Sequence, residues 1–131
     1  MPNPDLTTYK TLYLQTAREH LRDLKKDLTL LNQTPQDQHL VYEIFRLFHS
    51  LKSQNYFMGF QNTGNFCKTL ETYFRKIKDG FTAYHPAVSN IIIESIVQIE
   101  NSLNMIEKNG LEKDLHFEIS SFEKRLGLQW N

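Results

Sequence analysis

Apolar residues recur at intervals of three and four along almost the whole chain, with charged and polar residues between them. This spacing places the apolar side chains on one face of an amphipathic α-helix. The first helical segment shows the pattern clearly, with a stripe made of Leu14, Ala17, Leu21, Leu24, Leu28 and Leu31. No segment shows the strict alternation of a half-buried strand, so the pattern predicts an all-α fold.

Glycine and proline divide this pattern into five predicted helices. Gly59, Gly80 and Gly110 stand where helices commonly end, and Pro86 suits a first helical turn. The connections are short, so neighbouring helices should run antiparallel. We therefore predict an up-down four-helix bundle with an additional short C-terminal fifth helix. The expected helices run from about Asp5 to Asn32, Gln36 to Met58, Asn62 to Asp79, His85 to Asn109 and Lys113 to Leu126.

The composition favours a single domain over residues 1–131, with a core bundle over about 5–109 and the extra helix over about 113–126. Lys plus Arg and Asp plus Glu both number 15, so the chain has no bulk attraction for nucleic acid or anionic membrane. The single cysteine, Cys67, excludes an intramolecular disulfide and fits a reducing compartment. With no signal-peptide pattern and no membrane-length apolar run, we expect a cytoplasmic monomer.

His49 lies in a sequence of mostly apolar residues, yet the helical wheel turns it away from them. At about 100° per residue, His49 points roughly 130–140° from the core direction of the second helix. Lys52, three residues further on, would therefore lie on the same exposed side of the helix as His49. The core direction itself is defined by residues within roughly 40° of one another: Ile44, Phe48, Leu51, Asn55 and Met58.

The surface around His49 is aromatic and charged, which is typical of a docking face. A lone exposed histidine usually has no role, however, so spacing alone leaves the function of His49 open. No other residue pair suggests a metal site, because neither His116 with Glu118 nor Glu19 with His20 has the i, i+4 spacing of two ligands on one helix. The expected partner-binding residues around His49 are Tyr42, Phe45, Arg46, Ser53 and Tyr56.

The stretch "IFRLFHSLKSQNYFMGF", followed by "KTLETYFRKIKDG", resembles the histidine-containing phosphotransfer (HPt) domain family. The form it resembles is the N-terminal phosphoacceptor domain of chemotaxis histidine kinases of the CheA type. The shared features are a Phe-Arg pair before the histidine, His-Ser-Leu-Lys, a Gly-Phe pair, and a Leu-Glu pair on the next helix. They correspond here to Phe45-Arg46, His49 to Lys52, Gly59-Phe60 and Leu70-Glu71, and the resemblance extends from about Leu6 to Asn109.

The resemblance implies that Nε2 of His49 accepts the phosphoryl group and that Glu71 orients the ring. It also implies that Lys52 stabilises the phosphoryl oxygens, with Lys68 as an additional cation. From residue types alone, pairing with Lys68 or Arg75 on its own helix is the better explanation of Glu71. The chain has neither a P-loop nor a kinase-type glycine-rich loop. We therefore expect a phosphate carrier with no cofactor of its own, whose ATP and magnesium come from a histidine kinase ATP-binding domain.

The implied phosphate recipient is an aspartate on the receiver domain of a response regulator. The sequence departs from the family pattern at Ser53 and at Asn55, and the departure at Ser53 keeps an alternative open. Ser53 replaces the usual glycine, and Asn55 takes a core-facing position that is usually small or apolar. The alternative is a non-catalytic helical adaptor, or an inactive HPt relative, that binds a regulator through the aromatic face. The sequence does not show whether the domain is free-standing or part of a longer kinase. It does not show the role of Trp130 either.

Overall fold

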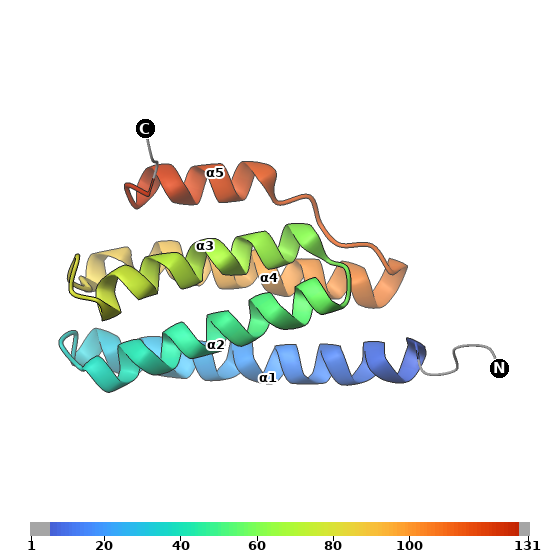
Figure 1. Cartoon of the computed structure of the whole chain (residues 1–131), viewed down its shortest axis with the longest axis horizontal. Helices are drawn as coiled ribbons and strands as arrows, with labels where there is room; N and C mark the ends of the chain where they lie inside the picture. Colours follow the sequence, from blue (N-terminus) through green and yellow to red (C-terminus); the bar gives the residue numbers. More distant parts are fainter. Residues whose placement is uncertain (1–5, 129–131) are drawn as a thin grey trace.

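A computed structural model describes residues 6–128 of the chain, with side chains from residue 8 onward. The described part consists of helices and connecting segments, and consecutive helices run in opposite directions (Figure 1). This confirms the predicted up-down helical bundle. The elements are α1 (Leu6–Gln33), α2 (Gln38–Phe57), α3 (Gln61–Lys78), the 3₁₀ turn η1 (Pro86–Val88), α4 (Ser89–Asn109) and α5 (His116–Arg125). Trp130 lies outside the described residues.

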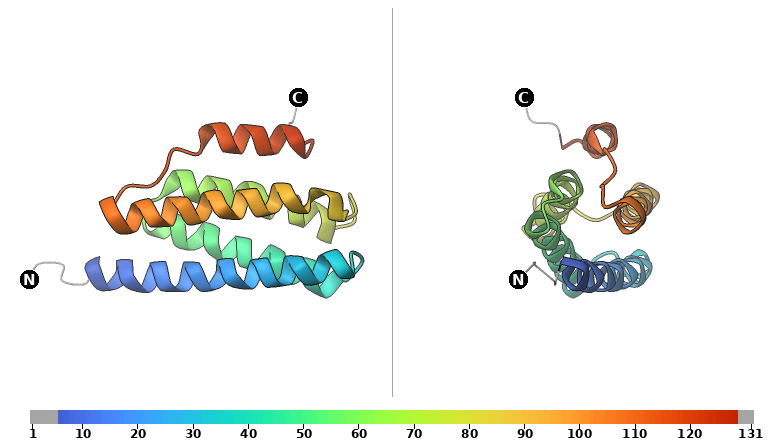
Figure 2. Two further views of the ribbon diagram at one scale, coloured as in Figure 1. Left: turned by 180° about the vertical axis from the view of Figure 1, so that it is seen from behind. Right: turned by 90° about the vertical axis from the view of Figure 1, so that its right-hand side faces the viewer.

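The first four helices form the bundle, and α5 is added on its outside. α2 packs along both α1 and α3, and α4 closes the bundle against α1 and α3. The end-on view in Figure 2 shows α5 beyond α3 and α4, the two helices that it contacts. None of the helices within residues 6–128 is long and apolar enough to cross a membrane.

The apolar stripes predicted from the sequence meet in one core. Phe48 of α2 stacks on Phe74 of α3, with ring centroids 5.9 Å apart, and both side chains are fully buried. Phe122 attaches α5 to this core through an edge-on contact with Phe66 at 6.0 Å. Burying a side chain of this size contributes about 1.5–3 kcal/mol, so the aromatic contacts hold α2, α3 and α5 in a fixed register.

The fourth and fifth helices begin later than predicted. Residues expected in the first turn of the fourth helix form η1 instead, and α4 begins at Ser89. The fifth helix was expected from about Lys113 but begins at His116. The backbone N–H of Lys113 donates to Ser102 Oγ at 3.0 Å, and the Asp114 carboxylate accepts from the backbone N–H of His116 at 3.0 Å. These side-chain partners hold the segment in a non-helical path up to His116.

A tight turn between α2 and α3 sets the register of the two helices. Gly59 has φ +86°, in the left-handed region that glycine adopts without strain. Just past the turn, the two helices approach closely at Gly64, where a Cβ atom would lie 2.4 Å from the ring of Tyr56. The Tyr56 hydroxyl also donates to Asn65 Oδ1 at 2.6 Å. The turn and this contact align the middle of α2 with the middle of α3.

The buried asparagine of α2, which the sequence left unexplained, has a hydrogen-bond partner at each polar atom of its side chain. Asn55 is fully buried, and its Nδ2 donates to the carbonyl oxygen of Leu51 at 2.8 Å. Its Oδ1 accepts from the hydroxyl of Tyr13 on α1. These bonds offset the cost of burying the amide, and Asn55 joins α1 to α2.

The N-terminus of α3 is anchored by a carboxylate from the segment between α4 and α5. Glu112 accepts from the backbone N–H groups of Asn62 and Thr63 at 3.1 and 2.6 Å. The Thr63 hydroxyl also donates to Glu112 at 2.7 Å. The first N–H groups of a helix have no partner within the helix, and a carboxylate there is favoured by the helix dipole. Glu112 thus ties the α2–α3 hairpin to the far side of the bundle.

Candidate functional site: His49, Glu71, Lys52 and Arg75

His49 lies near the middle of α2 with its side chain turned out of the core, as the helical wheel predicted. Its side chain is 54% exposed, whereas the adjacent Phe48 and the nearby Leu51 are fully buried. The buried residues fix the helix, and one helical turn then fixes the direction in which His49 points. The imidazole is therefore presented to solvent from a rigid element.

Glu71 of α3 reaches the imidazole from the neighbouring helix. The distance from His49 Nδ1 to Glu71 Oε2 is 2.7 Å, across 22 residues of sequence. The Glu71 side chain is only 2% exposed, so its carboxylate lies beneath the imidazole rather than beside it in solvent. The α2–α3 turn makes this contact possible because it aligns the two helix centres. The structure thus brings together the two residues that the resemblance paired.

Lys52 completes the environment of the Glu71 carboxylate. Its Nζ lies 2.8 Å from Glu71 Oε1, and its side chain is 19% exposed. Burial alone would raise the pKa of Glu71, but the hydrogen bonds from Lys52 and His49, together with their charges, lower that pKa below its ordinary value of 4.5. Glu71 is therefore an ionised carboxylate near neutral pH. In this structure the Lys52 ammonium is engaged with Glu71, next to the imidazole.

The ionised state of Glu71 determines which nitrogen of His49 carries the proton. A carboxylate can only accept hydrogen bonds, so His49 Nδ1 must be the donor of the 2.7 Å bond. In the neutral ring Nε2 is then unprotonated, and its lone pair is available for reaction. Glu71 consequently selects the tautomer in which Nε2 carries no proton.

Arg75 and Phe45 also belong to this site, although only the aromatic face around Phe45 was expected. Arg75 donates to Glu71 Oε2 at 3.1 Å, and its guanidinium carbon lies 5.4 Å from the Phe45 ring centroid. The Phe45 ring stacks with the imidazole of His49, with centroids 6.4 Å apart. The i, i+4 spacings of Glu71 with Arg75 and of Phe45 with His49 were visible in the sequence, but only as ordinary helical neighbours.

The comparison with protein families gives the same assignment as the site geometry. The family model described as "Hpt domain" matches residues 8–109, which include α2, α3 and every residue of the site. The chain belongs to the Hpt domain family. The matched range agrees with the extent of the resemblance inferred from the motifs, about Leu6 to Asn109.

The curated relatives of this Hpt domain include two bacterial proteins named Chemotaxis protein CheA. That of Bacillus subtilis is 27% identical over 106 residues, which is 81% of this chain and 16% of the relative. That of Listeria monocytogenes is 28% identical over 104 residues, 79% of this chain and 17% of the relative. The domain thus spans about one sixth of the length of these relatives.

A solved structure, the solution structure of the histidine phosphotransfer domain of CheA, has a similar fold. It superposes with a TM-score of 0.83 at 25% sequence identity, covering 93% of this chain and 91% of the solved chain. This Hpt domain is therefore homologous to the CheA phosphotransfer domain over nearly its whole length.

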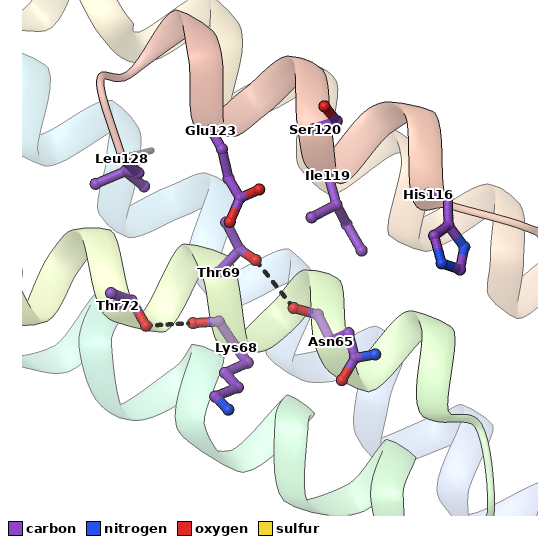
Figure 3. A pocket seen from close by; sticks show the side chains of 9 residues that line it. All are labelled: Asn65, Lys68, Thr69, Thr72, His116, Ile119, Ser120, Glu123 and Leu128. Carbon is purple, nitrogen blue, oxygen red and sulfur yellow. Dashed lines mark hydrogen bonds between the residues drawn. The ribbon is translucent and has the colours of Figure 1, made fainter. Parts of the chain in front are cut away.

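Lys68, expected as an additional cation at the site, lies on the border of a polar groove between α3 and α5. The groove has a volume of about 510 Å³. In Figure 3 the Lys68 side chain points away from α5. Within the described part of the chain no ion pair joins Lys68 to Glu71. The groove is also lined by Asn65, Thr69, Thr72, His116, Ile119, Ser120, Glu123 and Leu128.

The expected partner-binding residues occupy different environments. Tyr42 and Arg46 are exposed, and Tyr42 lies beside Phe45 with ring centroids 6.3 Å apart. Tyr56 is half-buried against Gly64, so part of its ring is committed to the α2–α3 hairpin. Ser53 is exposed one turn beyond His49. These positions keep Tyr42, Arg46 and Ser53 accessible to a partner.

An apolar groove between α1 and α2 begins at Ser53 and was not predicted. Its volume is about 460 Å³, and its lining is mostly apolar. Phe57 is 84% exposed and Leu12 is 58% exposed, which is unusual for side chains of this size. The other lining residues are Tyr9, Tyr13, Thr16, Gln54 and Met58. The sequence signal was weak because Leu12 and Phe57 lie 45 positions apart, and only the bundle brings them together.

Cys67 packs as a small apolar residue, as expected. It is fully buried, and burial raises the pKa of its thiol above the ordinary value. A buried thiol that stays protonated is a poor nucleophile. The described residues also bring together no group of three His, Cys, Asp or Glu side chains that would hold a metal ion.

Proposed function

We propose that this Hpt domain carries a phosphoryl group on Nε2 of His49. The observation that supports the proposal is the half-exposed imidazole whose Nδ1 donates to the buried, ionised Glu71 at 2.7 Å. In the neutral ring, this bond leaves Nε2 without a proton, and the exposed side of the imidazole makes that nitrogen accessible.

In the accepting step, the lone pair of His49 Nε2 attacks the γ-phosphorus of ATP held by a kinase domain. A nitrogen–phosphorus bond forms, the bond from phosphorus to the bridging oxygen breaks, and ADP leaves with that electron pair. Nδ1 keeps its proton, and the positive charge of the ring is balanced by Glu71. In the passing step, an aspartate carboxylate attacks the same phosphorus, and the electron pair of the broken bond returns to Nε2.

The partners we propose are the ATP-binding domain of a histidine kinase and the receiver domain of a response regulator, in a chemotaxis-type pathway. The curated relatives named Chemotaxis protein CheA support this choice. The kinase domain would supply ATP and magnesium, so the Hpt domain needs no cofactor of its own. Lys52 and Lys68 would add positive charge near the phosphoryl oxygens. We place this exchange in the cytoplasm, where ATP is available.

We further propose that the partner's active site reaches His49 over Ser53, which is exposed one turn further along α2. The serine hydroxyl is small, so a partner can approach His49 over it. A glycine-to-serine change in this position therefore reduces clearance without closing the site.

The test is transfer of label from γ-phosphate-labelled ATP in the presence of a CheA-type kinase domain. We expect acid-labile, alkali-stable label on the wild-type domain and none on the His49→Gln variant. The matched control is His39→Gln, which removes an exposed histidine from the first turn of α2 and should label normally. Label that survives His49→Gln would overturn the assignment. Binding of a regulator without any labelling, unchanged by His49→Gln, would instead support the adaptor alternative.

A further inference from the structure

Arg75 makes two contacts that converge on His49 without touching the reacting nitrogen. Its guanidinium donates to Glu71 Oε2 at 3.1 Å, the same oxygen that accepts from His49 Nδ1 at 2.7 Å. The other carboxylate oxygen, Oε1, is occupied by Lys52. One buried carboxylate therefore receives hydrogen bonds from three cationic or potentially cationic groups, and two of them share one atom.

The second contact of Arg75 is with the aromatic ring that stacks on His49. The guanidinium carbon is 5.4 Å from the Phe45 centroid, within cation–π range. Phe45 stacks with the imidazole at 6.4 Å and 27° between ring planes. Lys78 also reaches this ring, with its Nζ 5.2 Å from the centroid. Phe45 thereby holds the guanidinium on the side of Glu71 that faces His49.

We propose that Arg75 is a positioning residue that shares Glu71 Oε2 with His49 and so limits the negative charge that this carboxylate lends to the imidazole. The charged groups that contact the His49 environment are Glu71 and Arg75 from α3 and Lys52 from α2, with Lys78 on the far side of Phe45. A cation next to an imidazole disfavours a second positive charge on the ring, and Arg75 and His49 donate to the same carboxylate oxygen. Removal of the Arg75 charge is therefore expected to favour the protonated ring. This inference rests on the proposed role of His49.

The test is the pH at which half of His49 is protonated, followed by NMR of the imidazole C–H signals. In Arg75→Gln we expect that pH to rise by about half a unit, because Arg75 and His49 lie 3.1 and 2.7 Å from the same Oε2 atom and the loss of a charge that near has an effect of this order in a water-like medium. Arg75→Lys keeps the charge and should restore most of the wild-type behaviour. Arg75→Met, which keeps the packing of the stem on Phe45, should behave like Arg75→Gln.

The matched control is Arg125→Gln on α5, which removes an arginine of similar exposure that also pairs with a carboxylate, Glu94, at 2.8 Å. It should leave the titration of His49 unchanged. A rise in Arg75→Gln alone supports the proposal. No rise, a fall, or an equal rise in Arg125→Gln overturns it.

A second measurement separates this proposal from the proposed function. The rate of His49 labelling by a kinase domain should reach half its maximum at a higher pH in Arg75→Gln than in wild type, with the alkaline plateau changed by less than about twofold. The NMR titration needs no kinase, so absence of label would count against the function while the titration still decides the role of Arg75. If the labelling rate of Arg75→Gln stayed low at every pH while its His49 titration matched that of wild type, a positioning role would be contradicted.

Discussion

His49 Nδ1 and Glu71 Oε2 lie 2.7 Å apart, one atom in a half-exposed ring and the other in a buried carboxylate. This relationship makes the two ring nitrogens of the imidazole chemically different. The nitrogen that faces the protein is held as a donor, and the nitrogen that faces solvent is left free. The phosphocarrier proposal depends on this asymmetry.

Glu71 should make the stability of the domain depend on pH in a defined direction. Its pKa in the folded state is below the ordinary 4.5, so its contribution is present above that pH and is lost as pH falls through the lowered pKa. Glu71→Gln leaves Lys52 without its carboxylate, and we expect it to reduce the free energy of unfolding by about 1–3 kcal/mol at pH 7. Urea unfolding from pH 3 to pH 7 should show the two proteins converging at low pH. A difference that grows as pH falls would contradict this account.

The contribution of Asp27 to stability should depend on pH in the opposite direction. It is only 5% exposed on α1, and burial, followed by the hydrogen bond and charge of Glu43 on α2, raises its pKa from 3.8 to about 7. Because folding raises the pKa of Asp27, its contribution to the free energy of unfolding is fully present below pH 3.8 and is lost as pH rises through 7. We expect Asp27→Asn to be more stable than wild type by about 2–4 kcal/mol at pH 8.5, with a smaller difference at pH 5.

Thermal and urea unfolding at both pH values measure this difference. The matched control is Glu19→Gln, which neutralises an exposed carboxylate two turns earlier on α1 and should show little pH-dependent gain. Equal stabilisation by both substitutions would mean that removal of surface charge, and not the contact of Asp27 with Glu43, is responsible.

Gly64 should not tolerate a methyl group. A Cβ atom there would lie 2.4 Å from the Tyr56 ring, so the ring would have to move and its hydroxyl would lose Asn65. At an open helical position, glycine to alanine gains about 1 kcal/mol, whereas overpacking costs about 1–3 kcal/mol. We therefore expect Gly64→Ala to lower the free energy of unfolding. In a Tyr56→Ala background the same substitution should be neutral or stabilising, and a loss of equal size in both backgrounds would exclude this contact as the cause.

The hydroxyl of Tyr13, a buried residue of α1, should contribute to the stability of the bundle. Tyr13→Phe leaves the Oδ1 of Asn55 buried without a partner, which costs about 1–3 kcal/mol. Urea unfolding measures the loss. If Asn55 is also replaced by leucine, both polar partners are gone, and the second substitution should cost less in the Tyr13→Phe background than in wild type. Additive losses would contradict a direct bond between the two side chains.

Much of this architecture was predictable because it depends on one-dimensional periodicity. The stripe from Leu14 to Leu31 predicts a helix whatever it packs against, and the wheel orients His49 from the core-facing residues of its own helix. The pairing of His49 with Glu71 came from the resemblance, since residue types alone favoured the helical neighbours of Glu71 as its partners. The structure shows that Glu71 does both, pairing with Arg75 as well as with His49.

The remaining features depend on how side chains of different helices meet. Asn55 looked misplaced because its partner, Tyr13, lies 42 residues away on α1. The late start of α5 depends on Asp114 accepting from its own segment, a local hydrogen bond that competes with helix formation. The rise in the pKa of Asp27 requires Glu43 of α2 to lie opposite it. None of these relationships leaves a periodic signal in the sequence.

The most direct test of the account identifies the nitrogen that carries the phosphoryl group. The ¹⁵N-labelled domain would be phosphorylated by a CheA-type kinase domain with ATP, and the His49 ring nitrogens followed by long-range proton–nitrogen NMR before and after labelling. The account predicts that Nδ1 carries the proton beforehand and that phosphorus is bonded to Nε2 of His49 afterwards. Phosphorus on Nδ1, or on any other residue, would contradict it.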